Sequence, residues 1–257
     1  MPLREHLAEL RRRLFVCGLA ILAGSVGGWF AYGRLFDALQ RPLLDVGRDR
    51  GINANINFSE LSSAFNLQLK LSVYLGLVIA SPVWLYQLWA FVVPGLTRRE
   101  KRYALGFVAA AVPLFLSGIA LAWLILPNAV TFFADFVPEG SSIFTSADTY
   151  FTFVTRLMLS FAVAFVVPLL LVALNLAHVL PSRTLVRGWR VAVFLCFLFA
   201  AIASPTPDAG TMLMLAFPMV ALYLGAIGVA VLVDRRREKT RAADPLAQVG
   251  DDEASPL

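Results

Sequence analysis

Glu9 is the residue whose type and position first suggest chemistry, because a carboxylate at the mouth of a membrane span needs a compensating partner. It lies in the segment His6-Leu7-Ala8-Glu9-Leu10-Arg11, directly before the first long apolar run. Glu9 also stands four residues before Arg13, and on a helix that spacing gives a favourable ion pair of roughly 0.3 to 0.5 kcal/mol. A binding carboxylate and an ordinary helix ion pair are both open interpretations of Glu9.

A second carboxylate, Glu100, lies in the short basic segment that follows the second apolar run. Thr97 and Glu100 have the spacing of a capping box, which would start the next helix. Because the segment is short, Glu100 also stays close to the inner ends of two helices, on the same face as Glu9. Glu100 is therefore either a capping residue or a second binding carboxylate.

The residue inventory gives no support to an enzyme. The two histidines, His6 and His178, stand at opposite ends of the chain, and neither has a second His or Cys at metal-ligand spacing. Ser117 has no intramembrane histidine to act as its base, and no phosphate-binding Gly-Lys-Ser/Thr loop occurs. Cys17 and Cys196 lie inside apolar runs, where free Cys behaves as a small hydrophobe. We expect no catalysis, no metal and no cofactor.

The elements that must position these side chains are membrane helices. Apolar residues make up 59% of the 257 residues and charged residues 15%, which is the composition of a multi-span membrane protein. Six runs are near or above the roughly 17 to 20 residues that cross a bilayer as helix. These runs are Leu14 to Tyr32, Leu71 to Val93, Tyr103 to Leu126, Phe151 to Ala177, Gly188 to Ser204 and Thr211 to Val233. The predicted fold class is an all-α integral membrane protein with six transmembrane helices.

The basic residues predict the orientation of these helices. Most of the 22 Lys and Arg residues lie before the first run, after the sixth, and in the loops after the second and fourth runs. The loop from Pro127 to Thr149 has none. The positive-inside rule therefore puts both termini in the cytoplasm. The net charge of +5 follows from this topology, so we expect no nucleic-acid partner.

The segments between the runs predict two long outer loops and a charged tail. Gly33 to Asn66 has the composition of a loop, with a short interfacial helix at Asn57 to Phe65, and Pro127 to Thr149 forms the second loop. Residues 1–233 make a six-span membrane domain, and residues 234–257 a charged, disordered cytoplasmic tail.

Prolines within or at the ends of the runs predict kinked helices that form a concave, curved bundle. They are Pro82, Pro94, Pro113, Pro127, Pro168, Pro205 and Pro218. For any one of them, the general enrichment of Pro in membrane helices is an equal explanation.

Polar side chains inside the runs are few. Lys70 and Arg156 lie near the outer boundary, where a long side chain reaches water. Gln87 lies deep in the second run, so it either hydrogen-bonds a neighbouring helix or lines a binding cavity.

Three separated segments together resemble the TatC family, the signal-peptide receptors of the twin-arginine protein translocase. The segments are HLAELRRR before the first run, SPVWLYQLWAFVVPGLTRREKR at the end of the second, and SPTPD at Ser204 to Asp208. The resemblance runs from about Leu3 to Val233 and includes the number of spans. It implies a core subunit and twin-arginine signal-peptide receptor of the Sec-independent (Tat) translocase, which exports folded proteins across the membrane.

The resemblance also implies a set of site residues. Glu9 and Glu100 would bind the arginine pair of the signal peptide, since the planar donors of a guanidinium match a carboxylate. The family motif around them adds Arg11, Phe91, Pro94, Arg98, Lys101 and Arg102. Asp208 matches a periplasmic turn, with turn formation or helix capping as an equal explanation. Val166 departs from the family pattern, which commonly has an acid there, and Gln87 is a candidate replacement as an intramembrane polar contact.

The partners and location are implied in the same way. Cargo would be folded proteins with twin-arginine signal peptides, and the single-span TatA and TatB proteins would join a homo-oligomer of this chain in a larger complex in the lipid bilayer. The location would be the cytoplasmic membrane of a prokaryote, and transport would use the proton-motive force without a cofactor. A small secondary transporter is the alternative function, and the lack of an internal repeat disfavours it.

Overall fold

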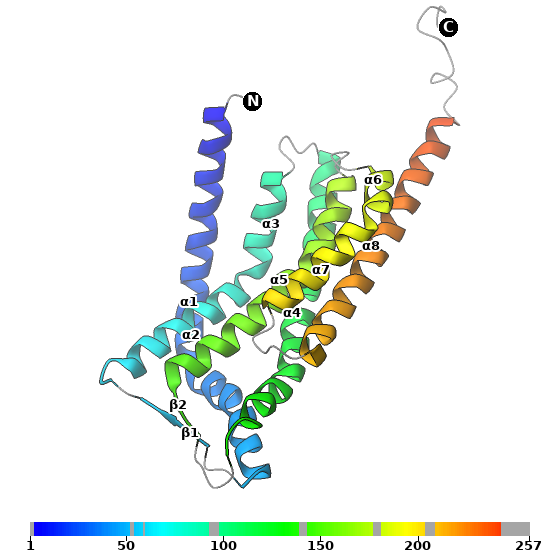
Figure 1. Ribbon diagram of the computed structural model, residues 1–257. Helices are drawn as coiled ribbons and strands as arrows, with labels where there is room; N and C mark the ends of the chain where they lie inside the picture. Colours follow the sequence, from blue (N-terminus) through cyan, green and yellow to red (C-terminus); the bar gives the residue numbers. More distant parts are fainter. Residues whose placement is uncertain are drawn as a thin grey trace, which may run out of the picture.

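The computed structural model is a helical membrane protein whose helices run between two ends, one carrying the N-terminus and the other a pair of short strands (Figure 1). The structure describes residues 3–51, 54–58, 60–92, 98–138, 143–176, 181–203 and 209–242. The elements are α1 Leu3–Asp49, β1 Ala54–Asn57, α2 Ser63–Ile79, α3 Ser81–Val92, α4 Arg98–Ala134, β2 Ile143–Ser146, α5 Ala147–Leu176, α6 Ser182–Arg187, α7 Trp189–Ala203 and α8 Ala209–Ala242. We call the two ends the N-terminal end and the strand end.

Helix α1 is much longer than the sequence predicts. It has 47 residues and continues to Asp49, so the loop expected from Gly33 is wrong over residues 33–49. The physical reason is a helical spacing hidden among charged residues: Leu39, Leu43 and Val46 recur at i, i+4 and i+7 and are buried against the core. The expected helix at Asn57 to Phe65 is also wrong, because Asn57 ends β1 and α2 begins at Ser63.

The second predicted span is a bent pair of helices. Helices α2 and α3 meet at Ala80 with an angle of 60°. Pro82 follows the break and lacks the N–H that would continue the helical ladder. The indole Nε1 of Trp84 donates to the backbone oxygen of Leu77 at 3.0 Å, which satisfies a carbonyl that the break leaves without its usual partner.

Close packing of helices depends on glycine at two crossings. A Cβ added at Gly76 of α2 would stand 2.6 Å from the backbone oxygen of Ile21 in α1. A Cβ at Gly118 of α4 would stand 2.6 Å from the backbone oxygen of Phe161 in α5. Small residues at such crossings let membrane helices approach through their backbones.

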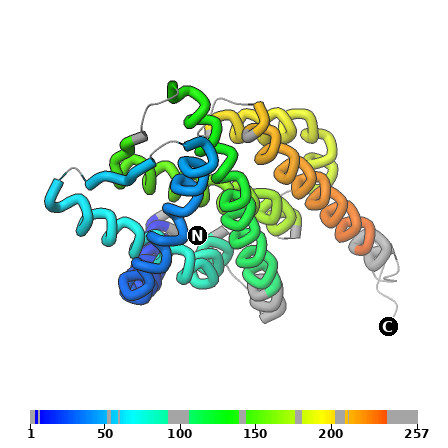
Figure 2. The backbone as a smooth tube through the Cα atoms, turned by 90° about the horizontal axis from the view of Figure 1, so that it is seen from below, coloured from blue at the N-terminus to red at the C-terminus, as the bar shows by residue number. Residues whose placement is uncertain are grey.

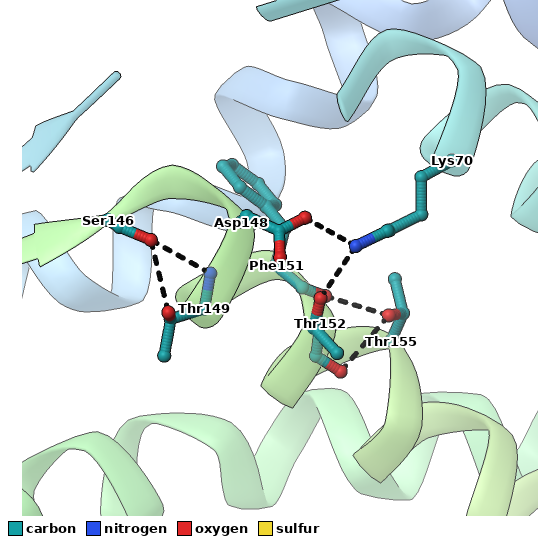
Figure 3. A network of polar contacts seen from close by, with 7 residues as sticks. All are labelled: Lys70, Ser146, Asp148, Thr149, Phe151, Thr152 and Thr155. Atoms are coloured by element: carbon teal, nitrogen blue, oxygen red, sulfur yellow. Dashed lines mark hydrogen bonds and ion pairs between the residues drawn. The ribbon is translucent and has the colours of Figure 1, made fainter. Parts of the chain in front are cut away.

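The strand end joins segments far apart in the sequence. Strands β1 and β2 pair in parallel, with Ala54 opposite Ile143. Arg50 forms an ion pair with Asp135, and Lys70 forms one with Asp148. Figure 3 shows Lys70 reaching from α2 to Asp148 and Thr152 at the start of α5.

Helix α4 continues through Pro127 to Ala134, so the loop predicted from Pro127 begins later than expected. Pro127 is one of two prolines inside α4, the other being Pro113. Helix α5 starts where Ser146 accepts a hydrogen bond from the backbone N–H of Thr149 at 3.2 Å, which is an N-cap contact.

At the far side from α1, α7 packs against α8 and α8 against α5 (Figure 2). The carboxylate of Asp234 in α8 accepts from Ser182 N at 3.0 Å and from Asn175 Nδ2 at 3.2 Å. Helix α8 continues beyond Asp234 to Ala242, through residues such as Arg235 and Arg236 that are good helix formers. The expected boundary at residue 234 therefore does not coincide with the end of the helix.

Four of the described helices are long and apolar enough to cross a membrane, in α1, α4, α5 and α8. The bent pair α2 and α3 makes a fifth if it counts as one span, and α7 is a shorter apolar helix. The protein is therefore a multi-pass membrane protein.

Candidate functional site

The candidate site lies at the N-terminal end, where the first turns of α1 approach α3. Glu9 and Arg13 are one turn apart on α1, and their side chains are 26% and 21% exposed. Arg13 Nε donates to Glu9 Oε1 at 3.0 Å, and Arg13 Nη2 bonds the same oxygen. The helix ion pair that the spacing predicts is confirmed.

The same guanidinium reaches a second helix. Arg13 Nη1 donates to Gln87 Oε1 of α3 at 3.1 Å. The prediction that Gln87 hydrogen-bonds a neighbouring helix is therefore confirmed, and the partner is α1. Glu9, Arg13 and Gln87 form one polar network, which we call the Arg13 bridge.

The Arg13 bridge leaves acceptor capacity on Glu9. Both hydrogen bonds from Arg13 go to Oε1, and in the part of the chain that the structure describes Oε2 has no partner. A carboxylate has about four lone-pair sites, so Glu9 can accept further donors while Arg13 holds it. The arrangement can therefore accept a further hydrogen-bond donor at a fixed place.

Gln87 and Val166, the position where the family pattern has an acid, lie in different surroundings. Val166 is 4% exposed and packs with Leu85, Trp89 and Phe107 in a buried apolar cluster between α3, α4 and α5. Leu85 and Gln87 are two residues apart on α3, so they point to nearly opposite faces of that helix. The side chain that faces α5 at this level is apolar, and Gln87 faces α1.

Other predicted site residues are distributed around this network. Arg11 is exposed and two residues from Glu9, about 200° around α1, so the structure does not bring it to Glu9. Phe91 is half-buried in the last turn of α3, one turn after Gln87. Trp89, two residues before Phe91 in α3, is 3% exposed and stacks on Phe107 with ring centroids 4.9 Å apart.

The remaining predicted residues fall partly or wholly outside the description. Arg98, Glu100, Lys101 and Arg102 lie in the first turns of α4, where the structure describes the backbone and not these side chains. Pro94 and Asp208 lie outside the described residues.

Sequence reasoning missed the bridging role of Arg13. The spacing of four residues identified its pair with Glu9, but no local signal links Arg13 to Gln87, which is 74 residues away. A group of three or more His, Cys, Asp or Glu side chains that could hold a metal ion does not occur among the described residues.

The fold and the site define a class: a helical, multi-pass membrane protein whose polar network is made of an ion pair and an amide. Comparison with known proteins identifies the family within this class. The family model described as Sec-independent protein translocase protein (TatC) matches residues 5–218. The chain belongs to the TatC family.

Individual relatives agree with this family over nearly the whole chain. A Sec-independent protein translocase protein TatC from Xylanimonas cellulosilytica is 53% identical over 94% of this chain and 88% of its own length. A chloroplastic TATC of Arabidopsis thaliana is 35% identical over 91% of this chain and 68% of its own length. The crystal structure of a twin-arginine translocase receptor TatC matches with a TM-score of 0.70 and 30% identity, covering 88% of this chain and 98% of that one. The members of this family are components of a protein translocase.

Proposed function

We propose that this chain is the core subunit of the Sec-independent translocase that binds twin-arginine signal peptides, with Glu9 and Glu100 as the arginine-binding carboxylates. The proposal rests on the hydrogen bonding of the two carboxylate oxygens of Glu9. Its Oε1 is held by Arg13 while its Oε2 has no partner among the described residues. A guanidinium entering from the N-terminal end can donate to that oxygen without first breaking the Arg13 bridge.

The second arginine of the peptide needs a second carboxylate. Glu100 stands in the first turn of α4, which follows α3 after a link of a few residues. Hydrogen bonds to charged groups contribute roughly 1.5 to 3 kcal/mol each when partly shielded from water. Two of them, together with burial of the apolar part of the signal peptide, would account for micromolar binding, about 8 kcal/mol.

The other residues of the proposed site are assigned from their positions in α3 and near the link between α3 and α4. Phe91 continues the face of Gln87 on α3, and Pro94, Arg98, Lys101 and Arg102 lie in or beside the link between α3 and α4. The apolar part of the peptide would lie along α3, where Val83, Tyr86 and Leu88 are exposed.

The proposed topology has six spans with both termini in the cytoplasm. The bent pair α2 and α3 is counted as one span, and the apolar helix Trp189–Ile202 as a short one. The excess of Lys and Arg at the N-terminal end supports the orientation, with the strand end and Asp208 on the outer side. The kinks expected at the prolines within α4, α5 and α8 and the concave bundle that they would form stay predictions. The cytoplasmic location of the charged tail predicted over residues 234–257 also stays a prediction, although α8 continues through its first residues to Ala242.

The proposed partners are twin-arginine signal peptides of folded cargo, single-span TatA and TatB family proteins, and further copies of this chain. A receptor built from so few helices cannot enclose a folded protein, so partner subunits must supply the rest of the pathway. We place the protein in the cytoplasmic membrane of a prokaryote, with transport driven by the proton-motive force.

Photo-crosslinking of a twin-arginine peptide to the purified chain tests the proposal. Glu9→Gln is expected to lower peptide binding about 10- to 100-fold, which corresponds to roughly 1.4 to 2.7 kcal/mol. Glu60→Gln, the same substitution at an exposed position near the strand end, is the matched control and should bind as the unaltered chain does. A twin-lysine peptide should also bind more weakly, because an ammonium cannot make a bidentate contact. Equal crosslinking in the Glu9→Gln and Glu60→Gln variants would overturn the assignment of Glu9.

A further inference from the structure

A groove on α5 near the strand end is separate from the Arg13 bridge. Its volume is about 830 Å³, and it extends along one face of α5 from Asp148 to Val163. Phe199 and Ile202 of α7 close its other side. Thr149, Thr152, Arg156 and Val163 recur at intervals of three, four and seven residues, so they share this face.

The polarity of the groove changes along its length. The end next to the strands has the charged and hydroxyl-bearing side chains of Asp148, Thr152 and Arg156. Farther along α5 the lining changes to Leu159, Ser160 and Val163, and the apolar side chains of Phe199 and Ile202 form the wall opposite α5. A groove that is polar at one end and apolar at the other matches a molecule with a polar head and an apolar tail.

The charge at the polar end is positive. Lys70 pairs with Asp148, so those two charges cancel (Figure 3). Arg156 is exposed and has no carboxylate partner in the part of the chain that the structure describes. One cation is therefore left over, which matches the single negative charge of a phosphodiester.

The hydroxyl of Thr152 is poised to add a hydrogen bond. Lys70 Nζ donates to Thr152 Oγ1 at 2.9 Å, so the oxygen already acts as an acceptor and its own hydrogen remains available to donate. Thr152 and Arg156 are one turn apart on the same face of α5. A phosphate oxygen between them can accept from the guanidinium and from the hydroxyl, and guanidinium groups bind phosphate in a bidentate manner.

The depth of Arg156 suits a lipid headgroup. Helix α5 has 30 residues, which is about 45 Å of helix against about 30 Å of hydrocarbon. Arg156 is nine residues from the start of α5, or about 13 Å along its axis. When the excess length is shared by both ends of α5, that point lies about 6 Å inside the hydrocarbon boundary, a distance that the long arginine side chain can cover to reach a headgroup.

We propose that this groove binds one anionic phospholipid of the leaflet at the strand end. The phosphodiester contacts Arg156 and Thr152, and the acyl chains lie along Val163, Phe199 and Ile202. A zwitterionic lipid binds more weakly, because its headgroup cation would stand beside the uncompensated charge of Arg156. The bound lipid would fill the space between α5 and α7.

Native mass spectrometry of the delipidated full chain, titrated with phosphatidylglycerol or phosphatidylcholine, tests this site. The unaltered chain should bind phosphatidylglycerol at least 10-fold more tightly than phosphatidylcholine. Arg156→Gln should abolish that preference, and Arg156→Lys should restore part of it. Arg34→Gln, which removes an exposed arginine of α1, is the matched control and should keep the full preference.

A second variant tests the apolar end. Val163 is 43% exposed in the groove, so Val163→Trp can fill the space without disturbing the core. It should weaken phosphatidylglycerol binding several-fold while Arg156 is intact, and inorganic phosphate should raise the Tm of neither protein.

Three results would overturn the proposal. Arg156→Gln could keep its preference for phosphatidylglycerol. Inorganic phosphate could stabilise the chain as well as the lipid does, which would indicate a simple anion site. Arg156→Gln could leave lipid binding unchanged and lower co-purification of a single-span membrane protein, which would make the groove a helix-docking surface.

Discussion

The strand end and the α1 and α3 side of the N-terminal end are held together in different ways. At the strand end, β1 pairs with β2, Arg50 pairs with Asp135, and Tyr150 donates to the backbone oxygen of Leu39 at 2.8 Å. These contacts join parts of the chain that are about 80 to 110 residues apart. At the N-terminal end, α1 and α3 are joined by the hydrogen bond from Arg13 to Gln87.

The two ends also differ in how deeply the side chains of α1 are buried. Residues of α1 near the N-terminus face outward, with Leu14 62% and Phe15 67% exposed. Large side chains of the same helix near the strand end, such as Leu39, are fully buried. For the proposed peptide site, we therefore expect entry between α1 and α3 at the N-terminal end, while the contacts of the strand end keep the helices in register.

Truncating a buried aromatic residue at the strand end should have the largest effect on stability. Phe151 is fully buried, and its ring centroid lies 4.9 Å from that of Phe36. Phe151→Ala should lower the free energy of unfolding by about 3 to 5 kcal/mol, because it leaves a cavity. Phe15→Ala is the matched control at the other end and should cost under about 1 kcal/mol, since lipid fills the space. Unfolding in mixed detergent micelles measures both, and equal losses would contradict the contrast between the two ends.

The extent of the strand end was the part of the fold least accessible from sequence. The apolar runs predicted the cores of the long helices, because their composition is unmistakable in a 30 Å hydrocarbon layer. They did not predict that α1 continues to Asp49, since charged residues between Leu39 and Val46 hide the buried face. The pairing of Ala54 with Ile143 has no local signal at all, because strand pairing depends on where α4 and α5 bring the chain.

At the N-terminal end, removing the amide that receives Arg13 should have an intermediate effect. Gln87→Leu deletes the acceptor of Arg13 Nη1 and should lower the free energy of unfolding by about 1 kcal/mol. Peptide binding should fall about threefold, less than in Glu9→Gln, because Glu9 keeps its charge and loses only part of its support. Titration with a labelled twin-arginine peptide measures this loss.

Gln68→Leu provides the control for this prediction. Gln68 is half-buried in α2, and its side chain makes no hydrogen bond with the described residues. The substitution should leave peptide binding unchanged. If Gln68→Leu and Gln87→Leu behave alike, the Arg13 bridge does not position Glu9.

The candidate site was predictable in its local parts only. The pair of Glu9 and Arg13 follows from helical spacing, and the location of Gln87 inside the second apolar run identified it as a side chain that needs a partner. That the partner is Arg13 depends on how α3 turns after the 60° bend at Ala80. The direction of that bend is set by tertiary packing, so the sequence could not assign Gln87 to α1 rather than α5.

The ion pair between Lys70 and Asp148 should show the smallest effect. Their side chains are 40% and 61% exposed, so water screens the attraction. A double-mutant cycle with Lys70→Met and Asp148→Asn should give a coupling of about 0.2 to 1 kcal/mol that decreases as salt is added. Lys70→Met alone should cost more than Asp148→Asn alone, because Lys70 also bonds Thr152.

The same double-mutant cycle on Glu9 and Arg13, which are 26% and 21% exposed, should give the larger coupling. A larger coupling for Lys70 and Asp148 would contradict this prediction. It would mean that water screens the charges at the strand end less than those at the N-terminal end, and that side-chain exposure does not determine the coupling.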